Sequence, residues 1–224
     1  MSGYLNVYDL IQGHSQNLNK IISFYDDYNL VCQKSFSEIH SDVVRMAQKL
    51  SRQLGKNEVF FISLPNSYEF LIVFLGSLKA GVIPAPIVSP DSMLKAEYFN
   101  FLREIKSGAE THKILALETY RSELVKEGFE FVSMTETPPS SEQDKFINNP
   151  QTPKYLPAHL NDQIAFVQFS SGSTSEPKGV LISHTALIEN ITQIKESLEL
   201  SNRSIIISWL PFFHDMGLIG SLLT

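Results

Sequence analysis

The 224-residue sequence contains a single cysteine, Cys32, so it cannot form a disulfide within the chain, and this usage is typical of a reducing compartment. It also lacks clusters of basic residues. Its 18 Lys and Arg are scattered among 24 Asp and Glu, unlike the charged footprint of a nucleic-acid-binding protein. No secretory signal opens the chain, because residues 1–10 are polar. These absences predict a cytoplasmic protein with no nucleic-acid partner.

Uninterrupted hydrophobic runs long enough to cross a membrane are also lacking. The most apolar stretch, residues 70–88, contains Lys79, Gly81, Pro84 and Pro86. A buried helix followed by a buried strand explains this stretch better than a membrane span. We therefore expect no membrane insertion.

Helical and strand-like patterns alternate from residue 35 onwards. Ser35 and Glu38 have the spacing of a capping box, and apolar residues then recur at helical spacing until Gly55. The patterns predict further helices at 66–80, 92–106, 120–126 and 184–200, and strands at 58–64, 82–88, 113–117, 129–133, 163–169, 179–184 and 204–210. This alternation is typical of an α/β fold with a largely parallel sheet, and the prolines of 82–88 favour a sheet edge or an irregular strand.

Two segments depart from the alternation. Residues 134–162 contain five prolines among Ser, Gln, Asn and Thr, which predicts a long surface connector. The last residues, Gly217–Thr224, are apolar and compatible with a helix but carry no stop signal. We therefore expect residues 1–224 to be part of a longer protein.

Residues 167–179 read VQFSSGSTSEPKG, which allows three interpretations: a flexible linker, a nucleophilic serine site or a phosphate site. The flanking strand-like segments disfavour a linker. The G-x-S-x-G spacing of a nucleophile elbow is absent, because Gly172 and Gly179 are too far apart. Small residues let backbone N–H groups converge on an anion, hydroxyls add donors, and Lys178 adds a positive charge. The phosphate interpretation is therefore favoured.

The usual phosphate loop of nucleoside triphosphatases does not fit these residues. In this stretch the lysine precedes the second glycine, and a strand-like segment rather than a helix follows. The loop is therefore predicted to connect two strands of a hairpin.

VQFSSGSTSEPKG resembles the AMP-binding signature of the acyl-adenylate-forming superfamily. Residues 35–90 are similar to the N-terminal core of that family, and WLPFFHDMGLIG (209–220) is similar to its next motif. The Leu-Pro-x-x-His-Asp-Met-Gly-Leu form of that motif resembles the fatty acyl-AMP ligases. The resemblance implies that residues 1–224 form an incomplete N-terminal part of the large domain, with the C-terminal lid domain lying beyond them.

The resemblance also implies the roles of individual residues. The phosphates of ATP would be held by a set of small residues and the lysine, namely Ser170, Ser171, Gly172, Ser173, Thr174, Lys178 and Gly179. Lys178 and His214 would be the catalytic residues, and His214, Asp215, Met216 and Gly217 would border the acyl substrate. Two of these have structural alternatives: His214 as a histidine at a buried helix N-terminus, and Asp215 as a helix N-cap. Trp209, Phe212 and Phe213 are interpreted as core residues.

The activity implied by the resemblance is that of a fatty acyl-AMP ligase. It would use ATP and Mg²⁺ to activate a fatty acid for an acyl carrier protein, as in the loading domain of a polyketide or peptide synthase. Acyl-CoA synthetase and amino-acid adenylation domain remain enzymatic alternatives, and a non-catalytic nucleotide- or carrier-binding module is an alternative of another class. The family's motifs for adenine, ribose and Mg²⁺ are not among these residues, so the 224-residue chain is expected to be inactive alone.

Overall fold

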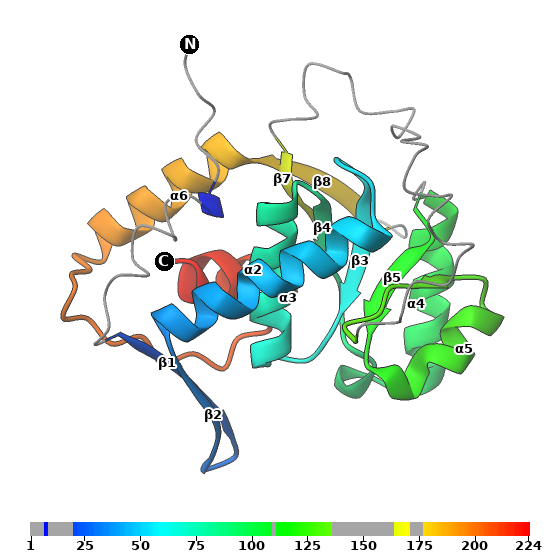
Figure 1. Ribbon diagram of the computed structural model, residues 1–224, viewed down its shortest axis with the longest axis horizontal. Coiled ribbons are helices and arrows are strands. Elements are labelled where there is room, and N and C mark those ends of the chain that lie inside the picture. Colours follow the sequence, from blue (N-terminus) through cyan, green and yellow to red (C-terminus); the bar gives the residue numbers. More distant parts are fainter. Residues whose placement is uncertain (1–6, 9–19, 109–110, 136–163, 171–176) are drawn as a thin grey trace.

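The computed structural model describes residues 7–8, 20–108, 111–135, 164–170 and 177–224, and everything below concerns those residues (Figure 1). It is an α/β structure built around a parallel sheet with the strand order β4-β3-β5-β6. These strands are β3 (Val59–Ser63), β4 (Ile83–Pro86), β5 (Lys113–Ala116) and β6 (Glu130–Phe131). The predicted parallel sheet is confirmed, because β3 pairs in parallel with β4 and β5, and β5 with β6.

Helices cover both faces of this sheet. Phe60 and Ile62 of β3 face one cluster of buried residues with α2 (Phe36–Gln53) and α3 (Tyr68–Ala80). Phe61 points to the opposite face and packs in a second cluster with α4 (Lys95–Gly108) and α5 (Arg121–Lys126). Successive side chains of a strand point to opposite faces of the sheet. Because helices cover both faces, every residue of β3 is buried or half-buried, which explains its nearly continuous run of apolar residues.

Capping residues in the local sequence determine where α2 and α3 begin and end. Ser35 and Glu38 form the predicted capping box at the start of α2. The prediction that the next helix begins at Asn66 is wrong, since Ser67 is its N-cap and accepts a hydrogen bond from the N–H of Phe70 at 3.2 Å. Gly81 ends α3 in the left-handed conformation, with φ of 70°.

The prolines of β4 place it as expected at an edge of the four-stranded sheet. Short 3₁₀ helices, η1 (Pro90–Ser92) and η2 (Glu118–Tyr120), precede α4 and α5. None of the helices in the described ranges is both long and apolar enough to cross a lipid bilayer.

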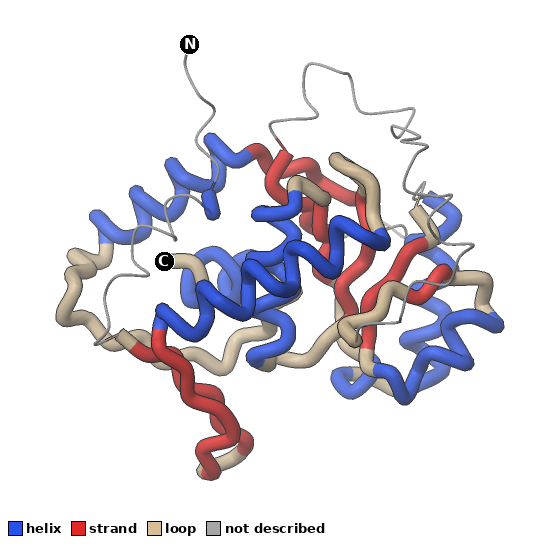
Figure 2. The backbone as a smooth tube through the Cα atoms, in the orientation of Figure 1, coloured by secondary structure: helices blue, strands red, loops and turns tan. Residues whose placement is uncertain are grey.

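An antiparallel hairpin that the sequence patterns did not predict precedes α2. It consists of β1 (Ile21–Asp26) and β2 (Asn29–Ser35), and it extends away from the body of the molecule (Figures 1 and 2). Phe24 of β1 contacts the rings of Tyr68 and Phe212, with ring centroids 6.2 and 6.4 Å apart.

The C-terminal part begins with a second hairpin, β7 (Ile164–Ser170) and β8 (Lys178–Ser183), followed by α6 (His184–Ser197). The strand predicted at 204–210 is wrong. These residues pair with no described strand, and the side chains of Ile205, Ile207 and Trp209 are 85–88% exposed. A short turn of helix, α7 (Asp215–Gly217), then runs into the π-helical η4 (Leu218–Leu222), as the helix-compatible residues predict.

Candidate active site

The predicted phosphate loop connects the two strands of the β7–β8 hairpin, so the predicted strand-loop-strand arrangement is confirmed. Ser170 and Lys178 pair directly across the antiparallel ladder, and Phe169 pairs with Gly179. The segment 171–176 between them lies outside the described residues. That segment contains four of the predicted phosphate ligands: Ser171, Gly172, Ser173 and Thr174.

Lys178 is the first residue of β8, and its side chain is exposed at the loop end of the hairpin. The next residue, Gly179, has little room for a side chain. A Cβ atom there would lie 3.0 Å from Cγ1 of Val167 on the neighbouring strand. The hairpin therefore presents a cation beside a glycine that allows the two strands to pack closely.

His214 and Asp215 begin the short helix α7. His214 has the extended backbone of an N-cap residue, but its side chain forms no capping hydrogen bond and is 60% exposed. The prediction of Asp215 as the N-cap is therefore wrong. Asp215 is the first helical residue, and its Oδ1 accepts the N–H of Met216 at 2.7 Å and lies 2.5 Å from Nδ1 of His214. The alternative interpretation of His214, a histidine at a buried helix N-terminus, does not agree with a side chain that is 60% exposed.

Gly217 is required by the packing of α7. A Cβ atom at this position would lie only 2.1 Å from the carbonyl oxygen of Pro211 and 2.8 Å from that of Leu210. Such contacts are impossible, so any larger residue would push the helix away from the 210–211 backbone. Gly217 is buried and Met216 is exposed, so the two residues predicted at the acyl substrate differ in access to solvent.

Asn66 holds the chain immediately before His214. Its Nδ2 donates to the carbonyl oxygen of Leu210 at 2.7 Å, and its Oδ1 accepts the N–H of Phe212 at 2.8 Å. One amide thus satisfies two backbone groups of an irregular segment, which is possible because the side chain of Asn carries both donors and an acceptor.

A second amide reaches the same segment from the phosphate-loop hairpin. Nε2 of Gln168 on β7 donates to the carbonyl oxygen of Phe213 at 2.9 Å. Its Oε1 is buried and accepts no hydrogen bond from a described residue. Sequence reasoning missed the roles of both Asn66 and Gln168. The signal for Gln168 was an amide within an otherwise apolar strand, and for Asn66 a polar residue directly after the buried strand β3.

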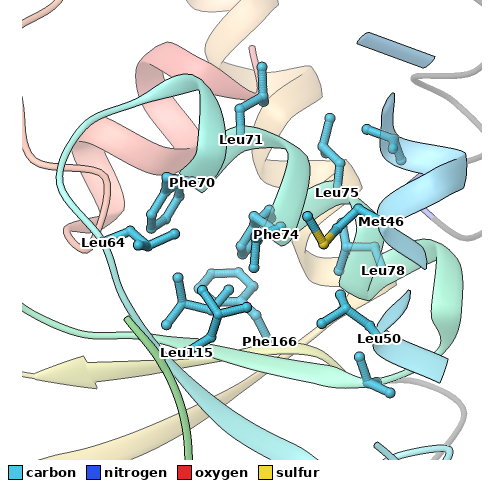
Figure 3. Packing of buried hydrophobic residues seen from close by; sticks show 14 of the residues in the cluster. Met46, Leu50, Leu64, Phe70, Leu71, Phe74, Leu75, Leu78, Leu115 and Phe166 are labelled. Carbon is cyan, nitrogen blue, oxygen red and sulfur yellow. The ribbon is translucent and has the colours of Figure 1, made fainter. Parts of the chain in front are cut away.

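A row of aromatic rings supports both parts of the site. Phe166 of β7 contacts Phe74, Phe74 stacks near Phe70, and Phe70 contacts Phe212, with centroid distances of 5.7, 6.1 and 5.4 Å. Figure 3 shows Phe70, Phe74 and Phe166 within this core. The core interpretation of Phe212 is confirmed, whereas Trp209 is exposed and Phe213 is half-buried.

Two other histidines, His40 and His184, form hydrogen bonds away from this site. Nδ1 of His40 is 3.0 Å from the hydroxyl of Tyr8, and Nδ1 of His184 accepts the N–H of Val7 at 3.4 Å. Within the described ranges, no three Cys, His, Asp or Glu side chains are grouped so that they could hold a metal ion.

A parallel α/β sheet, a hairpin with a serine- and glycine-rich loop, and a His-Asp-Met-Gly segment at its side together define an adenylate-forming type of domain. The chain belongs to the AMP-binding enzyme family, whose sequence profile matches residues 16–224. The family membership and the α/β fold therefore agree with the resemblance seen in the sequence motifs.

Individual relatives support the same placement. The chain is 31% identical to the medium-chain-fatty-acid–[acyl-carrier-protein] ligase JamA of Moorena producens, over 96% of this chain and 37% of the relative. It is also 31% identical to the long-chain-fatty-acid–AMP ligase FadD32 of Mycolicibacterium smegmatis, over 80% of this chain and 28% of that protein. The fold matches a fatty acyl-adenylate ligase from L. pneumophila in complex with acyl adenylate and pyrophosphate, with a TM-score of 0.74 and 24% identity. That match covers 97% of this chain and 37% of the other. The chain thus spans less than two fifths of the length of these proteins.

Proposed function

We propose that the enzyme containing these 224 residues is a fatty acyl-AMP ligase, and that residues 1–224 are the N-terminal part of its AMP-binding domain. The observation that carries the proposal is the β7–β8 hairpin, which places Lys178 directly opposite Ser170 where the serine- and glycine-rich loop begins and ends. Residues 134–162 would be a connector within this domain. The names of two relatives, JamA and FadD32, support the fatty acid as substrate.

In the proposed reaction, a carboxylate oxygen of the fatty acid attacks the α-phosphorus of ATP. The new bond forms the acyl-phosphate anhydride, and the bond between the α-phosphorus and the bridging oxygen breaks, so that pyrophosphate leaves with the electron pair. Negative charge increases on the leaving group. Catalysis of such a step depends mainly on positioning and electrostatic stabilisation.

The residues of this chain would supply the phosphate side of that arrangement. Lys178 provides a full positive charge at the hairpin, and the segment 170–174 provides backbone N–H groups and hydroxyls for the phosphate oxygens. His214 would lie beside the reacting carboxylate. Mg²⁺ would neutralise phosphate charge when bound, and its ligands would come from other parts of the enzyme.

The acceptor in this proposal is the thiol of an acyl carrier protein in the cytoplasm. The similarity to JamA, an acyl-carrier-protein ligase by name, supports this acceptor, and the enzyme would act as a loading module of a polyketide or peptide synthase. The acyl group would leave AMP and form a thioester with the carrier, which regenerates the free enzyme.

The test uses the full-length gene product with ATP, Mg²⁺ and a medium-chain fatty acid, in the presence or absence of CoA and of a thiol-bearing carrier protein. We expect pyrophosphate release, acyl-AMP that persists when CoA is added, and consumption of acyl-AMP by the carrier. Formation of acyl-CoA would identify an acyl-CoA synthetase instead. Activation of an amino acid would identify an adenylation domain, and the absence of pyrophosphate with every acid would identify a non-catalytic binding module.

A further inference from the structure

The segment that carries His214 has no regular structure of its own until α7 begins. Residues 204–213 form neither helix nor strand, so their backbone position must be set by contacts with other elements. Three of these contacts are hydrogen bonds with amide side chains: Asn66 donates one and accepts one, and Gln168 donates one. We call these two residues the amide clamp.

The two amides come from different parts of the fold. Asn66 lies between β3 and α3, while Gln168 lies on β7, two residues before Ser170 where the phosphate loop begins. Gln168 donates to the carbonyl oxygen of Phe213, the residue immediately before His214. The clamp therefore links the strand that leads into the loop directly to the histidine segment.

The position of His214 depends on this backbone rather than on contacts of its side chain with the core. Its imidazole is 60% exposed and contacts the adjacent Asp215. Its N–H donates to the carbonyl oxygen of Pro211 at 3.1 Å, and Gly217 packs against that same carbonyl. A movement of residues 210–213 would therefore move His214 with it.

We propose that Asn66 and Gln168 are positioning residues that hold His214 at a fixed distance from the phosphate-binding hairpin. The role assumes the acyl-AMP ligase activity proposed above. In that reaction the carboxylate near His214 and the α-phosphate near the hairpin must approach within attacking distance, and a misplacement of about 1 Å can cost about 100-fold in rate. The clamp would set that distance without touching either substrate.

This role predicts a particular kinetic signature. Because both amides bond to the backbone of residues 210–213, their loss should leave the KM values for ATP and fatty acid within about twofold and should lower kcat by about 10- to 100-fold. A residue that only stabilises the fold would lower the melting temperature, and the fraction that remains folded would keep its kcat.

The test compares Gln168→Met and Asn66→Asp with the wild-type full-length protein. Methionine fills a similar volume but cannot donate to Phe213, and aspartate keeps the acceptor for the N–H of Phe212 but loses the donor to Leu210. Gln33→Met and Asn29→Asp are matched controls on the exposed β2 strand, where the amide of Gln33 bonds only to Ser23. We expect both controls to keep wild-type kcat.

Hydrogen–deuterium exchange gives a readout that does not depend on activity. In both clamp variants we expect faster exchange in peptides covering residues 209–217, with unchanged protection in α3. The double variant should lose less activity than the product of the two single effects, because either loss alone already frees the same segment. If Gln168→Met fails to fold, the kinetics and the hydrogen–deuterium exchange of Asn66→Asp test the proposal.

The proposal is overturned if folded clamp variants keep the wild-type kcat, or if exchange at 209–217 is unchanged. It is also overturned if kcat falls only in proportion to the folded fraction. Failure of the proposed function would be seen separately, as a wild-type protein that releases no pyrophosphate with fatty acid and ATP. In that case the exchange experiment still tests whether the amides hold the segment.

Discussion

Ser170 and Lys178 occupy facing positions in the antiparallel register of β7 and β8. Facing residues on such strands have Cα atoms about 5 Å apart, so the two ends of the serine- and glycine-rich segment are held together by the ladder. The lysine therefore stays next to the loop without needing any order in its long side chain. This relationship makes the lysine the most direct target for testing the phosphate site.

Lys178→Ala should lower kcat/KM for ATP by about 100-fold in the full-length enzyme, comparable to the loss of one well-placed transition-state donor, about 3 kcal/mol. The melting temperature should change little, because contacts of an exposed lysine contribute at most about 1 kcal/mol. Pyrophosphate release at varied ATP measures the effect. Lys195→Ala, on the exposed face of α6, is the matched control. Equal kinetics in the two variants would remove Lys178 from the site.

Gly217→Ala should destabilise the protein by about 1–3 kcal/mol, because the added methyl group would overlap the carbonyl oxygen of Pro211. Gly108→Ala provides the comparison, since a Cβ atom at the end of α4 would meet nothing within 4 Å. That substitution should be neutral or slightly stabilising. Urea denaturation of both variants measures the difference, and equal stabilities would show that α7 can move away at no cost.

Burial raises the pKa of the Tyr98 phenol to about 12. Its hydroxyl lies 2.8 Å from Oγ of Ser63, which itself donates to the carbonyl oxygen of Val88 at 2.9 Å. The folded state therefore favours the neutral phenol, and an ordinary tyrosine pKa near 10 applies after unfolding. This contribution, about 2–3 kcal/mol, is fully present below pH 10 and is lost as the pH rises from about 10 to 12.

Tyr98→Phe should accordingly reduce the loss of stability between pH 9 and pH 11, at a cost of about 1 kcal/mol near neutral pH. Denaturant unfolding across this pH range checks the slope. Some alkaline sensitivity should remain, because burial also raises the pKa of Tyr68. Tyr28→Phe, in the exposed turn of the β1–β2 hairpin, should keep the wild-type slope. An unchanged slope in Tyr98→Phe would contradict the assignment.

The parts of the fold that the sequence predicted correctly depend on residues close together in the chain. The capping box of Ser35 and Glu38 spans one turn of helix, Gly81 ends its helix through its own backbone conformation, and the alternation of elements determines the parallel sheet. The strand–loop–strand form of the predicted phosphate site followed from the order of Lys178 and Gly179 and from the strand-like run after them.

The incorrect prediction at Asn66 and the missed role of Gln168 concern residues whose partners are distant in sequence. Asn66 looked like a helix start, but its amide bonds to residues 144 and 146 positions further along the chain. The run at 204–210 has the composition of a strand, yet composition cannot provide the partner strand that satisfies its backbone. The amide of Gln168 within an apolar strand signals a buried polar contact, but the local sequence does not identify Phe213, 45 residues away, as its partner.

The exposed side chain of Trp209 has a practical consequence. It is the only tryptophan of the chain, and it directly precedes Leu210, whose carbonyl group is bound by Asn66. Within residues 1–224, fluorescence excited at the indole therefore reports on one place, the entrance to the His214 segment. These residues carry their own probe there, and its response to an added nucleotide or fatty acid can be measured without attaching a dye.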